Sequence, residues 1–153
     1  MKILIDSHEK SLYQNMNKII IGNEIKNINL IQKTLDVGDV CIVDDNENPL
    51  ICIERKTVND LLSSIVDGRY KEQKYRLING VSKRVRKIYI IEGDTVNSFG
   101  LPQTTLLSCI INTIIRDEIF VIQTKSLDYT YNYLIKILEQ LPKYADNLLC
   151  ENN

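Results

Sequence analysis

Tryptophan is absent from this 153-residue sequence, histidine occurs once, and no apolar run approaches the length of a membrane-spanning helix. A helix that crosses a bilayer needs about 20 predominantly apolar residues. The first ten residues, MKILIDSHEK, also lack a signal-peptide pattern, because Asp6 interrupts the apolar run almost at once. We therefore expect a soluble protein that is not secreted and does not enter a membrane.

Cysteine is scarce and scattered along the chain. The four cysteines form no Cys-x-x-Cys pair, and the single His8 cannot complete a zinc site with them. Cys41, Cys52 and Cys109 lie in apolar surroundings, which is typical of buried thiols in a reducing compartment. The sequence therefore predicts free, buried thiols.

An excess of one charge is also missing overall, although it is present locally. The 19 basic and 20 acidic residues leave a net charge of −1, which taken alone argues against a nucleic-acid-binding protein. Residues 54–87, however, hold 10 basic and 4 acidic residues, whereas the segments on both sides are acidic. The middle of the chain therefore carries a positive field that the net charge hides.

Apolar stretches alternate with helical patterns along the whole chain. Its 44% hydrophobic and 25% charged residues are the usual globular mixture, and its length suits one domain. Strands are predicted at 2–6, from 28, and at 40–45, 50–54, 87–93 and 119–124, and helices at 11–21, 57–68, 69–78, 101–117 and 127–141. This alternation, with a hairpin around the turn DNENP, predicts an α/β fold whose mixed central sheet is flanked by helices.

Acidic residues occur where the predicted strands end. Asp6 ends the first strand, with Glu9 three residues later, and Asp39 follows a Val-Gly turn. Glu54 ends another strand and Lys56 lies two residues beyond, on the same side of an extended chain. Two carboxylates from neighbouring strands can share a Mg²⁺ ion with phosphate oxygens, and a lysine can position the attacking water, help deprotonate it or stabilise the phosphate. The pattern predicts a metal-dependent phosphodiesterase, with scattered surface charge as the alternative.

The order of these motifs resembles the nuclease domain of the XPF family of structure-specific endonucleases. That family carries GD followed by ERKxxxD, which here reads GD at 38–39, ERK at 54–56 and then Asp60. The stretch SIVDGRYKEQK is similar to the family's DGR-Q segment, and LIDSHEK and YIIEG resemble two of its strands. The segment GLPQTTLLSCIINTIIRDEIFVIQT resembles the Mus branch, the catalytic subunits of crossover-junction and flap endonucleases.

The resemblance covers about residues 2–140 and implies a restriction-endonuclease-like fold with a Mg²⁺ or Mn²⁺ cofactor. It implies an endodeoxyribonuclease that cuts branched DNA, such as 3′ flaps, nicked junctions and forks, in repair or recombination. The motif match gives the following site residues: Asp39, Glu54 and the Arg55 carbonyl as metal ligands, Lys56 as the catalytic lysine, Asp6 and Glu9 as further acidic members, and Asp60, Arg69 and Gln73 as residues that support the site or contact DNA.

The helix predicted from residue 69 concentrates polar and basic side chains. Arg69, Gln73 and Arg76 are spaced i, i+4 and i+7 and share one face, and Lys74 belongs to a second row. Phosphate contacts from such a helix would be independent of base sequence and sensitive to salt. A solvated helix face is the alternative.

We expect a nuclease domain over residues 1–142 and a polar tail over residues 143–153, without the helix-hairpin-helix module that enzymes of the family usually carry. Family nuclease domains pair, and Tyr129, Tyr131 and Tyr133 give the last helix an apolar excess, so a homodimer or heterodimer is expected. A non-catalytic DNA-binding or dimerisation subunit and a Holliday-junction-resolvase-like enzyme of the same fold are the alternatives. The expected location is intracellular, in the nucleus or another site of DNA replication and repair.

Overall fold

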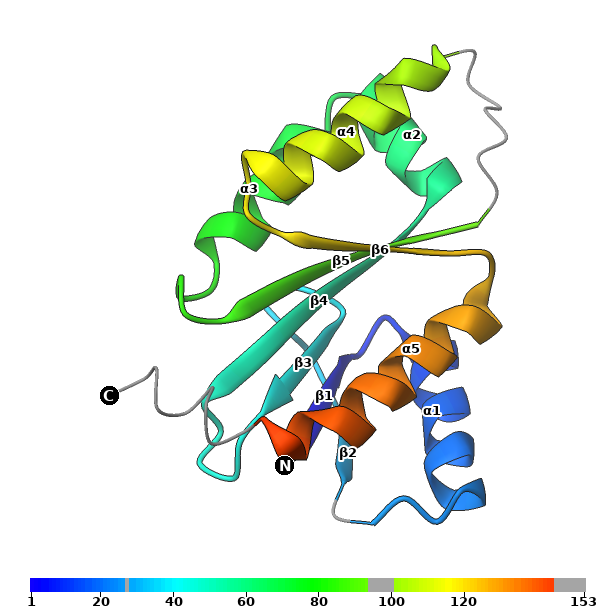
Figure 1. Ribbon diagram of the computed structural model, residues 1–153, viewed down its shortest axis with the longest axis vertical. Helices are drawn as coiled ribbons and strands as arrows, with labels where there is room; N and C mark the ends of the chain where they lie inside the picture. The colour runs from blue at the N-terminus through cyan, green and yellow to red at the C-terminus, as the bar shows by residue number, and fades with distance from the viewer. Residues whose placement is uncertain (27, 94–100, 145–153) are drawn as a thin grey trace. The chain divides into compact units, whose positions relative to one another are not determined.

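The computed structural model describes residues 1–26, 28–93 and 101–144, in which strands and helices alternate much as predicted (Figure 1). The strands are β1 Lys2–Asp6, β2 Asn29–Lys33, β3 Val40–Val43, β4 Pro49–Thr57, β5 Arg86–Glu92 and β6 Phe120–Thr124. The helices are α1 Lys10–Gly22, α2 Val58–Val66, α3 Tyr70–Asn79, α4 Gln103–Ile115, α5 Leu127–Gln140 and the short 3-10 helix η1 Leu141–Lys143.

The six strands hydrogen-bond into one sheet in the order β2-β1-β3-β4-β5-β6. β1 pairs with β2 in parallel and with β3 in antiparallel orientation, and β3 and β4 form the predicted hairpin. The α/β class and the mixed sheet are thus confirmed. No helix among the described residues is both long and apolar enough to span a bilayer.

β4 differs from its prediction at the charged residues. The sequence predicts a strand that ends at Glu54, but β4 continues through Arg55 and Lys56 to Thr57. The Thr57 hydroxyl then caps α2 by accepting a hydrogen bond from the Asp60 N–H at 3.1 Å. The predicted end was wrong because adjacent charges look like a strand terminus, whereas here the charged side chains are half-buried against partners.

The chain divides into two compact units, and β4, α3 and β5 each run through both. The first unit comprises Met1–Glu54 and Tyr75–Ile88. In it, α1 packs along β1 and β2 (Figure 1) and buries Leu12, Met16 and Ile20. These apolar positions recur at helical spacing, which is why the sequence predicts this helix.

The second unit comprises Arg55–Lys74 and Tyr89–Asn153. In it, α4 and α5 contact β6 from opposite sides (Figure 1). α5 buries Tyr131, Leu134 and Leu138, so the amphipathic pattern of the last predicted helix is confirmed. The predicted polar tail lies, from residue 145 onward, outside the described residues.

Two of the thiols are buried, as the sequence predicts. Cys41 and Cys52 are paired in register across β3 and β4 and are free thiols. Burial raises the pKa of Cys41 and raises the pKa of Cys52 to about 12, so both are unreactive at neutral pH. Cys109 is half-buried, and Cys150 lies outside the described residues.

Candidate active site

Three neighbouring strands bring carboxylates to one edge of the first unit. Asp6 is the last residue of β1, Asp39 directly precedes β3, and Glu54 lies in β4. The Asp6 N–H donates to the Asp39 carbonyl at 2.8 Å, and the Asp39 N–H donates to the Ile53 carbonyl at 2.8 Å. Because neighbouring strands lie about 4.8 Å apart, these hydrogen bonds place the main chains at Asp6, at Asp39 and next to Glu54 side by side.

The Asp6 carboxylate is engaged within the protein. One oxygen accepts a hydrogen bond from the Leu35 N–H at 2.8 Å, and the other accepts from the His8 N–H at 3.1 Å and lies 2.8 Å from His8 Nδ1. Burial raises the pKa of Asp6, but these hydrogen bonds outweigh it and hold the pKa below the ordinary 3.8. The Asp6 carboxylate therefore holds the turn at His8 and the chain at Leu35, four residues before Asp39.

The backbone around the acids is held by Glu9 and Gly38. The Glu9 N–H donates to the Asp6 carbonyl at 2.9 Å, and Glu9 is the N-cap residue of α1. Gly38 has a φ of +77°, and a Cβ at this position would lie 2.7 Å from Cys52 Sγ. Only glycine satisfies both conditions, so Gly38 allows the chain to enter β3 close against β4 with Asp39 beside it.

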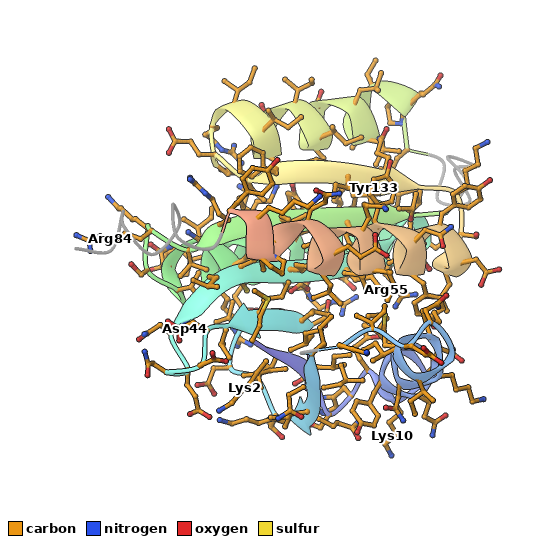
Figure 2. All side chains as sticks on the ribbon, turned by 60° about the horizontal axis from the view of Figure 1, so that its bottom comes forward. Lys2, Lys10, Asp44, Arg55, Arg84 and Tyr133 are labelled. Carbon is orange, nitrogen blue, oxygen red and sulfur yellow. The ribbon has the colours of Figure 1, made fainter. Side chains whose placement is uncertain are left out.

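Arg55 and Lys56 lie at the end of β4, in the second unit, and each has a partner. Arg55, labelled in Figure 2, donates from Nε and Nη2 to the two carboxylate oxygens of Glu92 at 2.9 and 2.7 Å. Lys56 Nζ donates to Oε1 of Gln73 on α3. Because side chains alternate along a strand, Arg55 and Lys56 occupy opposite faces of β4.

Glu92 lies outside the set of residues that the sequence predicts for the site. Its side chain is 7% exposed at the end of β5, and Thr130 Oγ1 donates to it at 2.6 Å. Burial raises the pKa of Glu92, but the bonds from Arg55 and Thr130 hold it below the ordinary 4.5. The available signal was a lone acid at the end of an apolar strand, the placement that also marks Asp6.

The other predicted support residues are mostly exposed. Asp60 lies in the first turn of α2. Arg69 precedes α3 and forms an ion pair with the neighbouring Asp67 at 2.7 Å. Arg76 is exposed on the part of α3 that belongs to the first unit. Arg69 and Arg76 therefore both lie at the surface, where Asp67 offsets the charge of Arg69.

Lys74 is buried, unlike these arginines. Its ammonium donates to the hydroxyls of Tyr70 and Thr113 and lies 3.2 Å from the Asp117 carboxylate. The side chains of Lys74 and Asp117 are 5% and 6% exposed. Burial lowers the pKa of Lys74 although Asp117 opposes the shift. Lys74 thus supports α3 against α4 instead of standing in an exposed basic row.

The predicted metal ligands have the donor chemistry of a Mg²⁺ or Mn²⁺ site. Within residues 1–26, 28–93 and 101–144, no three His, Cys, Asp or Glu side chains are grouped closely enough to hold an ion by themselves. The predicted set of Asp39, Glu54 and the Arg55 carbonyl instead combines two carboxylates with a neutral oxygen. Mg²⁺ is usually bound in this way, with one or two carboxylates and the remaining positions filled by water and phosphate oxygens.

Residues 5–137 match the ERCC4 domain. The chain belongs to the ERCC4 domain family. A probable crossover junction endonuclease mus81 from Dictyostelium discoideum is 34% identical over 91% of this chain, and the human structure-specific endonuclease subunit MUS81 is 31% identical over 89%. The structure of XPF from Aeropyrum pernix in complex with DNA superposes with a TM-score of 0.72 at 23% identity, covering 93% of this chain and 65% of that one.

The resemblance to XPF nuclease domains and to the Mus branch is confirmed by these matches, and the superposition confirms the restriction-endonuclease-like fold. The chain spans only 17% of the Dictyostelium relative and 25% of the human one. What it shares with these ERCC4 proteins is therefore one domain.

Proposed function

We propose that this ERCC4 domain is the nuclease part of a Mg²⁺- or Mn²⁺-dependent, structure-specific endodeoxyribonuclease. It hydrolyses phosphodiester bonds near branches, such as 3′ flaps, nicked junctions and forks, in repair or recombination. The observation that carries the proposal is the hydrogen-bonded edge of Asp6, Asp39 and Glu54, with Lys56 two residues further along β4. Such a substrate implies an intracellular protein, at the nucleus or another place where DNA is replicated and repaired.

The carboxylates divide into metal ligands and supporting acids in this proposal. Asp39, Glu54 and the Arg55 carbonyl would hold the ion, which when bound lowers the pKa of a coordinated water and neutralises charge on the scissile phosphate. We assign Asp6 to positioning Asp39, because the Asp6 carboxylate is already engaged within the protein. Glu9, joined to Asp6 through the main chain, is the remaining acidic member.

Lys56 supplies positive charge at the reacting phosphate. Its ammonium is held by the Gln73 amide oxygen, and a neutral amide orients the lysine without cancelling its charge. Held in this way, Lys56 stabilises the additional negative charge of the pentacovalent phosphate or positions the attacking water. Gln73 is accordingly a positioning residue.

Exposed cations would bind the DNA backbone. Within the basic segment, Arg55 and Lys74 are largely buried in ion pairs inside the second unit, whereas Arg69, which pairs with Asp67, and Arg76 are exposed. Contacts from arginine to phosphate do not depend on base sequence, and they weaken as salt is added. Asp60, exposed at the start of α2, stays a supporting residue in this scheme.

We also propose that the domain pairs with a second copy of this chain through α4. Four apolar side chains at helical spacing, 45–73% exposed, line one face of α4: Leu107, Ile111, Ile114 and Ile115. An apolar stripe of this size is typical of an interface, and the human relative is named a subunit. The tyrosine-rich α5 exposes fewer large side chains, because Tyr131 is buried and only Tyr129 and Tyr133 are about half exposed.

Light scattering at micromolar concentration tests the pairing. The wild type should be a dimer, and Ile111→Asp should be a monomer because a charge at the centre of the stripe cannot be desolvated cheaply. Asn112→Asp, at an exposed position of α4 turned away from the stripe, is the control and should remain dimeric. A monomeric wild type would contradict pairing between copies and would leave a heterodimer with a related chain.

A gel cleavage assay on a labelled 3′ flap and a labelled nicked four-way junction tests the activity. Each substrate is incubated with Mg²⁺, Mn²⁺ or EDTA, and cutting near the branch is expected only with metal. Binding without cutting in either metal would favour the non-catalytic subunit. Symmetric cutting of an intact four-way junction, with flaps left whole, would favour a resolvase-like enzyme.

Asp39→Ala tests the metal-ligand assignment. It should abolish cleavage and retain binding to the flap, because phosphate contacts come from other residues. Asp36→Ala removes an exposed carboxylate three residues earlier and should cut like the wild type. Full activity in folded Asp39→Ala protein would reject the assignment.

A further inference from the structure

A buried network joins the end of β4 to three other elements of the second unit. Glu92, at the end of β5, accepts both guanidinium hydrogen bonds of Arg55. Thr130 on α5 donates to Oε2 of Glu92 at 2.6 Å, and the hydroxyls of Thr124, on β6, and Thr130 lie 2.8 Å apart. Apart from the Arg55 carbonyl, none of these groups takes part in the proposed reaction.

The hydrogen bonds of this network have a definite direction. Thr130 is 0% exposed, and Glu92 and Thr124 are each 6% exposed. A hydroxyl has one proton to donate, and the short contact assigns the Thr130 proton to the carboxylate, so the Thr124 hydroxyl donates to the Thr130 oxygen. All donors therefore point toward Glu92, whose charge Arg55 balances. Such charge-assisted, bidentate bonds are strong and fix the plane of the guanidinium.

Stability alone is a poor explanation for this arrangement. Removing two charges from water costs free energy comparable to what their attraction returns, and apolar side chains of similar volume often stabilise a fold as well. An apolar pair cannot supply direction, however. The two parallel hydrogen bonds hold the Arg55 side chain, and with it the end of β4, at one distance and one rotation relative to β5 and α5.

We propose that Glu92 and Thr130 are positioning residues. They fix the Arg55 main chain and thereby orient the Arg55 carbonyl and the Lys56 side chain. The strand is held from both faces, since Glu92 holds Arg55 on one and Gln73 holds Lys56 on the other. The inference rests on the proposed function, in which that carbonyl binds the metal ion.

Variants of Thr130 and Glu92 test the positioning role. Thr130→Val removes the hydroxyl and keeps the shape, Thr130→Ser restores the hydroxyl, and Glu92→Gln removes the charge. Leu134→Ala is the control, because Leu134 is a buried residue one turn further along α5 whose side chain has no hydrogen-bonding group. Single-turnover cleavage rates and the Kd for a labelled 3′ flap are measured at a temperature at which circular dichroism shows every variant folded.

The cleavage rate should fall about 10- to 100-fold in Thr130→Val and Glu92→Gln, the range typical of outer-shell positioning groups. The Kd for the flap should stay near that of the wild type, because no DNA contact is lost, and Thr130→Ser should recover most of the rate. Leu134→Ala should cut at about the wild-type rate. Equal losses in the control and in the network variants, or no loss in the network variants, would overturn the inference.

Amide hydrogen exchange in the metal-free protein separates this inference from the proposed function. Thr130→Val should accelerate exchange at residues 55–57 by about tenfold, the factor expected for one lost hydrogen bond to a charged group, and Leu134→Ala should not. If the wild type cuts no branched DNA, the proposed function fails and exchange alone decides. Acceleration confined to the end of β4 would support positioning by Glu92 and Thr130, and unchanged exchange would reject it.

Discussion

Replacing Asp117 alone should destabilise the domain far more than replacing Asp117 and Lys74 together. Their charged groups lie 3.2 Å apart, and both side chains are almost fully buried. Asp117→Ala leaves the Lys74 ammonium buried without its counter-charge, which for such pairs costs about 3–5 kcal/mol. The lysine can release its proton, and burial already lowers its pKa, so we expect the lower end of this range.

The double variant Lys74→Met/Asp117→Leu removes both charges and keeps most of the volume. Buried pairs replaced in this way are often neutral or stabilising, and the Thr113 hydroxyl keeps its hydrogen bond to the Cys109 carbonyl at 2.6 Å. Arg116, which also pairs with Asp117, is 63% exposed and can be solvated by water. We therefore expect the double variant to lie within about 1 kcal/mol of the wild type.

Urea unfolding followed by circular dichroism at pH 7 measures these differences, and a repeat at pH 9 adds a test of sign. In Asp117→Ala the folded state disfavours the charged lysine, so the unfolded state binds more protons and the stability of the variant should rise with pH. Equal stabilities of the single and double variants would refute the reasoning. The reasoning would also be refuted if Lys74→Met had wild-type stability but weaker DNA binding, because that result would show that Lys74 is exposed and contacts DNA.

Two further predictions concern Gly38 and Glu92. Gly38→Ala should lower the free energy of unfolding by about 1–2 kcal/mol because of the left-handed backbone, and by more because of the contact to Cys52, and it should slow cleavage. Gly22→Ala is the control, because an added Cβ there meets nothing within 4 Å. Equal urea midpoints for the two variants would contradict the strain at Gly38. Stability should also fall as the pH drops below about 4.5, because the folded-state pKa of Glu92 lies below that ordinary value and the unfolded chain takes up the proton first. Glu92→Gln should make the acid side of the stability curve less steep, and an unchanged slope would contradict the assignment.

Much of the fold could be predicted from local pattern. The apolar spacing of Leu12, Met16 and Ile20 encodes the face of α1, and the strand Lys2–Asp6 has the predicted bounds. Such features depend on residues close together in the chain. The end of β4 could not be predicted in this way, because the half-buried Arg55 is held by Glu92, which lies 37 residues away in the sequence.

Two acids of the candidate site, Asp6 and Asp39, stand at strand boundaries that are visible in the sequence. Asp6 follows an apolar strand and Asp39 follows the turn at Gly38. The hydrogen-bond partners of the site residues could not be predicted. Lys56 and Gln73, for example, are 17 residues apart, and no local sequence pattern indicates their contact. Lys74 shows the opposite error. A basic residue on a polar helix is predicted to be exposed, but Lys74 is buried in an ion pair with Asp117.

The continuity of β4 also constrains how the segment can change in length. A loop absorbs an inserted or deleted residue, but a strand has a period of two, and one residue more or less turns every later side chain to the other face. A deletion just before Arg55 would exchange the faces of Arg55 and Lys56, so that each would meet the partner meant for the other. The number of residues in β4 before Glu-Arg-Lys therefore matters as much as the identity of these three residues.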